Sequence, residues 1–301
     1  MKIGLIDVDS HNYPNYALMK ISAYHKAKGD SVEWASPLFG EYDRIYKSKI
    51  FTFTPDDYTR YDCEVVKGGT GYDIASRLPE EIENFEGLDY SIYPYDFSVV
   101  FTSRGCIRKC PFCVVSHKEG YINPIPPSQR FLNPKGKYIE VMDNNFFANP
   151  QWKEAVEWLN ATKQPIRLMG VDARILTDEQ CQALSTMRHN GTIHIAWDNI
   201  SDKILHKIVM LTKYIKPEKI SCYVLVGYDS TIEDDLTRIY SLRAAGIVPF
   251  VQPFRDYDNL CEPTQYEKDL ARWANNRFLF KSCDFENFEP RKGFKCVEYL
   301  K

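Results

Sequence analysis

No hydrophobic run in this 301-residue sequence approaches the roughly 20 apolar residues that a membrane-spanning helix needs. Neither sign of charge dominates, because 38 Lys and Arg residues stand against 41 Asp and Glu residues, a formal charge of −3. Such a balance provides no broad positive field for nucleic acid or an anionic membrane surface. The beginning of the chain turns acidic at Asp7 and Asp9, too early for a signal peptide. We therefore expect a cytoplasmic protein that has neither a membrane nor a nucleic acid as its partner.

Cysteine is also too rare for a scaffold held by disulfides, since the chain has only nine. In a reducing compartment, cysteines more often serve metal sites or chemistry than cross-links. Six of them are scattered: Cys63, Cys181 and Cys222 fall at apolar positions of expected strands or helices, and Cys261, Cys283 and Cys296 are widely spaced near the end. We expect the first three to act as small core residues. The last three lack the tight spacing that a second metal cluster would need.

Strand-like and helix-like patterns alternate along most of the chain, which predicts an α/β fold. In residues 1–95 we expect a strand at 2–8, a helix at 15–28 closed by Gly29, and short strands at 31–34 and 63–66. A further strand pattern, rich in Tyr, Ile, Phe and Thr, covers residues 42–54. These elements predict a small, truncated Rossmann-like domain.

Beyond residue 95 the alternation becomes regular. We expect six strands, at 97–102, 138–142, 166–171, 192–197, 220–226 and 248–252. Capping boxes at Thr177-Asp-Glu-Gln180 and Ser230-Thr-Ile-Glu233 mark the starts of two of the helices between them. Repeats of this kind imply parallel strands, and six are fewer than the eight of a closed barrel. The prediction is a partial (β/α)6 TIM-like barrel over residues 96–255, followed by a C-terminal helix and tail over 256–301.

The remaining three cysteines lie together in Ser103-Arg-Gly-Cys106-Ile-Arg-Lys-Cys110-Pro-Phe-Cys113, directly after the first strand of the repeating region. Loops that follow the strands of parallel α/β folds build their active sites. Three thiolates in one loop can hold an iron–sulfur cluster and leave one iron open to a substrate or cofactor. Zinc is the competing metal, and His117 could supply its fourth ligand.

The spacing Cys106-x-x-x-Cys110-x-x-Cys113, with the aromatic Phe112 before the third cysteine, resembles the signature of radical S-adenosylmethionine (SAM) enzymes. The resemblance covers roughly residues 96–255. It implies that the three cysteines bind a [4Fe-4S] cluster, that Phe112 lies beside the cofactor, and that SAM occupies the open iron. It further implies reductive cleavage of SAM to a 5′-deoxyadenosyl radical, with an electron from a protein such as flavodoxin or ferredoxin.

The same resemblance suggests which strand ends would bind SAM. Met142-Asp143-Asn144-Asn145 looks like the cobalamin-type version of the motif for the SAM amino group, with Asp143 foremost, although an Asx turn would explain it as well. Asp172 and Arg174 could hold the SAM ribose and carboxylate, or pair with each other. Asp198 ends the fourth strand, or caps a helix near Asn199. Gly227 lies where the family packs adenine against backbone.

The first domain resembles a cobalamin-binding domain. Asp9-Ser10-His11-Asn12-Tyr13-Pro14 is similar to the loop in which a His ligates cobalt, and Gly68-Gly69 would match glycines near the nucleotide tail. Two departures are Pro14, which replaces a glycine, and the missing helices between the second and fourth strands. A degenerate domain that serves as a lid or substrate platform is the alternative to a functional cobalamin site.

The sequence therefore predicts a radical SAM enzyme that abstracts hydrogen from a substrate left open by the sequence, or transfers a methyl group if cobalamin binds. One alternative is an enzyme similar to tRNA methylthiotransferases. The segment Ser116-His-Lys-Glu-Gly120 favours this alternative, and the lack of a second cysteine triplet disfavours it. The other alternative is a non-catalytic iron–sulfur or zinc protein.

Overall fold

The computed structural model describes residues 1–10, 13–38, 40–258 and 261–301. The chain divides into two compact units, Met1–Glu140 and Val141–Lys301. Each unit contains a sheet of parallel strands together with helices, so the predicted α/β class is confirmed. The predicted division into residues 1–95, 96–255 and 256–301 stays a prediction.

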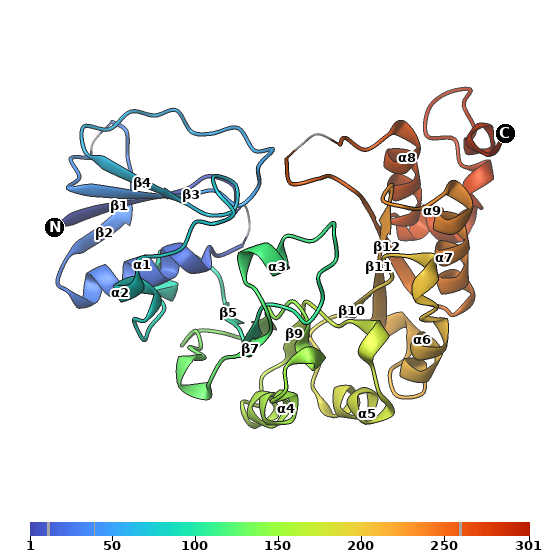
Figure 1. Ribbon diagram of the computed structural model, residues 1–301, viewed down its shortest axis with the longest axis horizontal. Helices are drawn as coiled ribbons and strands as arrows, with labels where there is room; N and C mark the ends of the chain where they lie inside the picture. The colour runs from blue at the N-terminus through green and yellow to red at the C-terminus, as the bar shows by residue number, and fades with distance from the viewer. Residues whose placement is uncertain (11–12, 39, 259–260) are drawn as a thin grey trace. The chain divides into compact units, whose positions relative to one another are not determined.

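The first unit consists mainly of short strands, and α1 is the longest of its helices (Figure 1). They are β1 (Lys2–Asp7), α1 (Tyr16–Ala27), β2 (Ser31–Trp34), β3 (Arg44–Ser48), β4 (Glu64–Gly68), α2 (Glu80–Glu83), β5 (Phe97–Val100), β6 (Ser103–Arg104), α3 (Val115–Lys118), β7 (Asn123–Pro124) and β8 (Tyr138–Val141), the last of which ends one residue inside the second unit.

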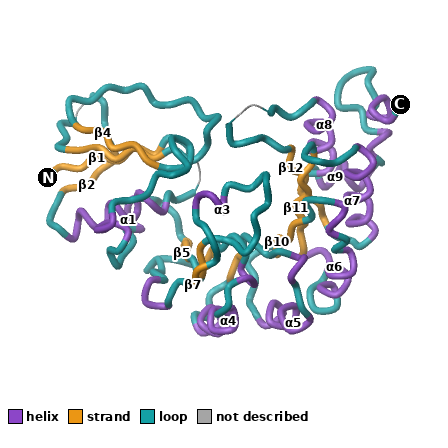
Figure 2. The backbone as a smooth tube through the Cα atoms, in the orientation of Figure 1, coloured by secondary structure: helices purple, strands orange, loops and turns teal. Residues whose placement is uncertain are grey.

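Strands β1 to β4 form a parallel sheet in the order β2-β1-β3-β4. Ile3 and Leu5 of β1 are buried against Leu18 and Ile21 of α1, which covers one face of the sheet. On the other side Figure 2 shows loops where a doubly wound fold would carry helices. A strand order that reverses beside β1 is typical of doubly wound sheets. The Rossmann-like character of this domain stays a prediction.

Helix α1 shows how local sequence sets these boundaries. The Asn15 side chain accepts a hydrogen bond from the Leu18 amide at 3.2 Å and caps the first turn. Gly29, at φ +86°, follows the last turn and lets the chain reverse into β2. By contrast, the strand predicted over 42–54 is paired only from Arg44 to Ser48, so its predicted length was wrong.

In the second unit helices and strands alternate regularly from α4 to β12 (Figure 1). Its elements are α4 (Trp152–Ala161), β9 (Ile166–Leu168), α5 (Asp178–Thr186), β10 (Ile193–Ala196), α6 (Leu205–Thr212), β11 (Ile220–Val226), α7 (Ile232–Ala244), β12 (Val248–Pro253), α8 (Gln265–Ala274) and α9 (Arg277–Ser282).

Strand β11 is the centre of the parallel sheet β10-β11-β12. Its side chains alternate between buried and half-buried along the whole strand, the period-two pattern that makes a strand readable from sequence. A parallel bridge from Val171 to Ile195 links the segment after β9 to β10. All six predicted strands are present, most of them one to three residues shorter than expected. Closure of these strands as a TIM-like barrel stays a prediction.

The capping boxes were predicted correctly at one of the two helices. Thr177 and Gln180 form a reciprocal capping box at the start of α5. At α7 the box is Thr231 with Asp234, one residue later than predicted, because Thr231 adopts the extended backbone of a cap and accepts from the Asp234 amide. Across the described part of the chain, no helix has the length and apolar character needed to cross a membrane.

Candidate functional site

The three predicted cysteine ligands lie on one loop of the first unit. The loop leaves β6, carries Cys106, Cys110 and Cys113, and enters the short helix α3. Strand β7 then returns beside β6 in an antiparallel pair, so the loop is closed at its base. All three cysteines are half-buried, as is Phe112, the predicted aromatic neighbour of the cofactor. The loop follows β5 and β6, as the sequence predicts.

Backbone hydrogen bonds shape this loop around the sulfur atoms. The Arg108 amide donates to Cys106 Sγ at 3.4 Å, and the Cys113 amide donates to the Cys110 carbonyl at 3.0 Å. Amide–sulfur contacts of this kind are one of the means by which proteins tune iron–sulfur clusters. The contact turns the Arg108 amide toward Cys106, so the loop curls around that sulfur.

The charge around the cysteines is predominantly positive. Four basic residues stand against the single carboxylate of Glu119: Arg104 at the end of β6, Arg108 and Lys109 in the loop, and Lys118 at the end of α3. These positive charges would offset the negative charge of a cluster held by three thiolate ligands.

The remaining cysteines lie in different environments. Cys181, Cys222 and Cys296 are fully buried, and burial raises the pKa of Cys181 to about 11 and that of Cys296 to about 12. Such thiols stay protonated near neutral pH and act as small apolar residues, in agreement with the prediction for Cys181 and Cys222. Cys63 is only half-buried.

Among the residues that the structure describes, no three or more His, Cys, Asp or Glu side chains are gathered as a ready metal site. The case for a cluster on the loop therefore depends on its donor set. Residues 106–113 supply three thiols from one continuous segment, which is the soft donor set that iron–sulfur clusters require. By its chemistry this donor set fits the group that the sequence implies.

The predicted SAM-binding residues at the strand ends belong to the second unit, where several lie together. Asp143 and Asn145 follow β8 and are buried, with 1% and 2% of their surface exposed. The Asn145 side-chain amide donates to Asp172 Oδ2 at 3.2 Å. Two of the predicted strand-end segments are thus joined by a direct contact.

Arg174 is the centre of this group of side chains. Its Nε atom lies 2.8 Å from Asp172 Oδ1, so the two residues pair with each other, one of the two outcomes expected from the sequence. The guanidinium also lies 3.8 Å from Asp198 Oδ2 and 3.6 Å from Asp202 Oδ2. Burial raises the pKa of Asp198, and the charge of Arg174 offsets part of that rise. Asp198 does not cap the next short helix, because Asn199 occupies that position.

Gly227 follows β11 at φ +80°, and a Cβ atom there would lie 2.6 Å from the carboxylate of Glu267. The glycine is thus accounted for by the close approach of Glu267.

Sequence reasoning missed Arg238 of α7. This side chain is fully buried and donates to the carbonyls of Trp197 at 2.8 Å and Asp198 at 2.7 Å, while its other nitrogen pairs with Asp235 at 2.6 Å. Arg238 thus holds the backbone of Trp197 and Asp198, which directly follow β10. The only sequence signal is Asp235, three residues earlier on the same helix face.

The predicted cobalamin loop is described only in part. His11 lies outside the described residues. Asp9 is buried, and its carboxylate accepts hydrogen bonds from the amides of Ile50 and Phe51, both at 2.8 Å. Gly69 has φ +98°, and a Cβ atom there would lie 2.2 Å from the Lys49 carbonyl. Asp9 and Gly69 thus have structural tasks in holding the connection between β3 and β4.

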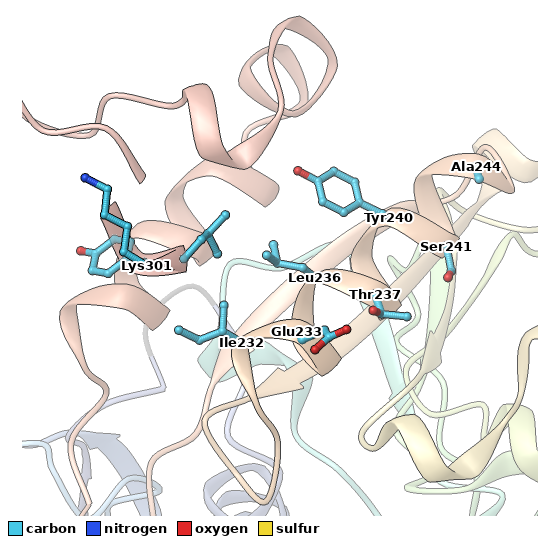
Figure 3. A pocket seen from close by; sticks show the side chains of 10 residues that line it. Ile232, Glu233, Leu236, Thr237, Tyr240, Ser241, Ala244 and Lys301 are labelled. Atoms are coloured by element: carbon cyan, nitrogen blue, oxygen red, sulfur yellow. The ribbon is translucent and has the colours of Figure 1, made fainter. Parts of the chain in front are cut away.

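A groove runs along α7 of the second unit. It has a volume of about 730 Å³ and is lined by Ile232, Leu236 and Tyr240 of α7 and by Leu300 near the C-terminus (Figure 3). The lining carries none of the predicted site residues.

A comparison of the sequence with models of known protein families finds no match. A comparison with curated proteins also finds none.

Proposed function

We propose that this protein is a radical SAM enzyme, which cleaves SAM reductively at a [4Fe-4S] cluster and uses the resulting 5′-deoxyadenosyl radical to abstract hydrogen from a substrate. The observation that carries the proposal is the loop of Cys106, Cys110 and Cys113, closed at its base by β6 and β7. Its three thiols are half-buried and lie among positively charged side chains. Three ligands leave one iron of a four-iron cluster open to SAM.

In this proposal the protein's residues bind and orient rather than react. The three cysteines would hold the cluster, and Phe112, between the second and third, would lie beside it. The cluster would take one electron from flavodoxin, ferredoxin or a similar reductant and supply it to SAM.

The SAM-binding role falls to the second unit. Asp143 and Asn145 would accept hydrogen bonds from the SAM amino group, and Asp172 would accept from the ribose. Arg174 would pair with the SAM carboxylate, while Asp198 and Gly227 would lie along the nucleoside. Support comes from the contacts that join Asn145, Asp172, Arg174 and Asp198 into one group.

Methyl transfer is the second form of the reaction if the first domain binds cobalamin through His11. Methyl transfer has less support than hydrogen abstraction, because Asp9 and Gly69 already have structural roles at the connection between β3 and β4. The visible spectrum of protein produced in the presence of cobalamin tests whether the domain binds it, because bound cobalamin has its own absorption bands. Substitution of His11→Ala should abolish these bands if His11 ligates cobalt.

Anaerobic reconstitution with iron and sulfide tests the main proposal. We expect about four irons per chain, and 5′-deoxyadenosine after addition of SAM and a reductant. A colourless zinc protein that leaves SAM intact would instead identify a structural metal site, with His117 as the candidate fourth ligand. An iron protein that does not cleave SAM would be non-catalytic. Either result would overturn the proposal.

A further inference from the structure

The side chain of Glu119 ties together the two chain segments at the base of the cysteine loop. One carboxylate oxygen, Oε1, accepts a hydrogen bond from the Arg104 guanidinium at 2.8 Å. The other, Oε2, accepts from the Gly105 amide, also at 2.8 Å. Both oxygens are therefore used by the two residues that directly precede Cys106.

Gly105 has almost no freedom in this position. Its φ is +81°, and a Cβ atom there would lie 2.4 Å from the carbonyl oxygen of Tyr121. The following amide, that of Cys106, donates to the Gly120 carbonyl at 3.2 Å. The backbone on the N-terminal side of the first cysteine is thus fixed by side-chain and main-chain contacts to residues 119–121.

Arg104 and Lys118 extend the same set of contacts. The Arg104 guanidinium lies over the ring of Phe101, 4.1 Å from its centroid, so the partner of Glu119 is itself held in place. At the end of α3, the Lys118 carbonyl accepts from Arg77, and the Lys118 ammonium donates to the Ser76 carbonyl. The segment that carries Glu119 is therefore anchored independently of the cysteines.

We propose that Glu119 is a positioning residue that holds Cys106 in place for cluster binding. The inference rests on the proposed function, because Glu119 can position a cluster ligand only if the loop binds a cluster. The Glu119 side chain fixes the backbone next to a predicted ligand, because it accepts from the amide of Gly105. A group that orients a metal ligand through its backbone affects metal retention without touching the metal.

Three variants separate this role from general stability. Glu119→Ala removes both hydrogen bonds. Glu119→Gln keeps an oxygen that can accept from Gly105, but its amide group repels the donors of Arg104. The control is Glu64→Ala, which removes an exposed pair with Arg44 in the same unit, 2.7 Å apart. The rate of iron loss to a chelator is measured on each reconstituted protein, together with the electron paramagnetic resonance (EPR) spectrum of the reduced form.

We expect Glu119→Ala to lose iron about tenfold faster than the wild type, the lower end of the effect of removing such orienting groups. Glu119→Gln should fall between the two, and Glu64→Ala should match the wild type. The EPR g-values of Glu119→Ala should shift, a change that a loss of stability elsewhere would not cause. Iron loss within twofold of the wild type for both Glu119 variants would overturn the inference.

A second measurement on the iron-free protein keeps the two proposals apart. Hydrogen exchange of the peptide that contains Gly105 and Cys106 should be faster in Glu119→Ala than in the wild type, whether or not any iron binds. If the wild type takes up no iron, the proposed function fails. If iron binds and the exchange of this peptide is unchanged in Glu119→Ala, the positioning role fails.

Discussion

Arg174 and Asp172 stand two residues apart in the segment that follows β9, and they form an ion pair 2.8 Å apart. Asp198 and Asp202 lie within 4 Å of the same guanidinium, so one positive charge is shared by three carboxyl groups. The surplus of acidic groups suits a ligand with a net positive charge. SAM, with its sulfonium and amino groups, is such a ligand, which is why this group of residues belongs to the proposed function.

Replacement of the cysteines tests the cluster ligands. Cys106→Ala, Cys110→Ala and Cys113→Ala should each lose the brown colour and the cleavage of SAM, because two thiolates cannot retain the cluster. The matched control is Cys261→Ser, an exposed cysteine outside the loop, which should keep both. Iron content and 5′-deoxyadenosine are the measurements. A cysteine-to-alanine variant that retains full turnover would refute the ligand assignment.

Asp143 is the predicted partner of the SAM amino group. Loss of a hydrogen bond to a charged group costs about 1.5–3 kcal/mol, so Asp143→Asn should raise the KM for SAM about tenfold or more. The iron content should stay at the wild-type value, because Asp143 is not a cluster ligand. Glu179→Gln, which breaks an exposed pair with Lys153, is the control and should leave the KM unchanged. An unchanged KM in Asp143→Asn would remove Asp143 from the site.

The buried pair of Arg238 and Asp235 should be important for stability. Arg238→Met leaves the Asp235 carboxylate and the carbonyls of Trp197 and Asp198 buried without their donor. Removal of one partner from a buried pair costs about 3–5 kcal/mol, and we expect a loss of that size in urea denaturation.

An exposed ion pair on the same helix is the comparison for Arg238. Arg243 lies 2.7 Å from Asp284, whose side chain is 53% exposed. Arg243→Met should lower the free energy of unfolding by less than about 1 kcal/mol. Equal losses for the two variants would show that Arg238 does not have the buried role assigned to it.

Asp89 in the first unit predicts a pH dependence of stability. Burial disfavours its charged form, but hydrogen bonds from Lys26, Ser22 and Ser91 outweigh burial and lower the pKa from 3.8 to about 2. A lowered pKa stabilises the fold above pH 3.8, and this contribution is lost as the pH falls through about 2. Lys26 is 41% exposed, so solvent screening reduces the gain.

We therefore expect Asp89→Asn to reduce the free energy of unfolding by about 1 kcal/mol at neutral pH. The difference from the wild type should shrink as the pH falls from about 4 to about 2. Denaturation curves at several pH values provide the measurement. A difference that stays constant over this range would mean that the Asp89 carboxylate is not stabilised by these hydrogen bonds.

The sequence predicts elements best where the signal is local. Strand β11 was predicted with correct bounds because one face of it is buried and the other half-buried, which leaves a pattern of period two. The strand predicted over 42–54 was too long, since Phe51 and Phe53 resemble strand residues but stack on each other, half exposed, beyond the last paired residue. Local preference cannot show where a strand loses its neighbour.

The candidate site shows the same limit. The cysteine motif is contiguous, so the sequence reveals it directly. Glu119 acts through a chain reversal that brings it back to Arg104 and Gly105, and no periodic pattern marks such a contact. Arg238 resembles a solvated residue of an amphipathic helix, whereas the structure buries it completely. Residues whose roles arise from long-range contacts need the folded chain to be recognised.

The EPR spectrum of the reduced, reconstituted protein tests the central claim most directly, because it reports on the iron that the three cysteines leave open. We predict a [4Fe-4S] signal whose g-values change when SAM is added and that is absent from Cys106→Ala. A spectrum that SAM leaves unchanged, or a reconstituted protein with no iron signal, would contradict the account.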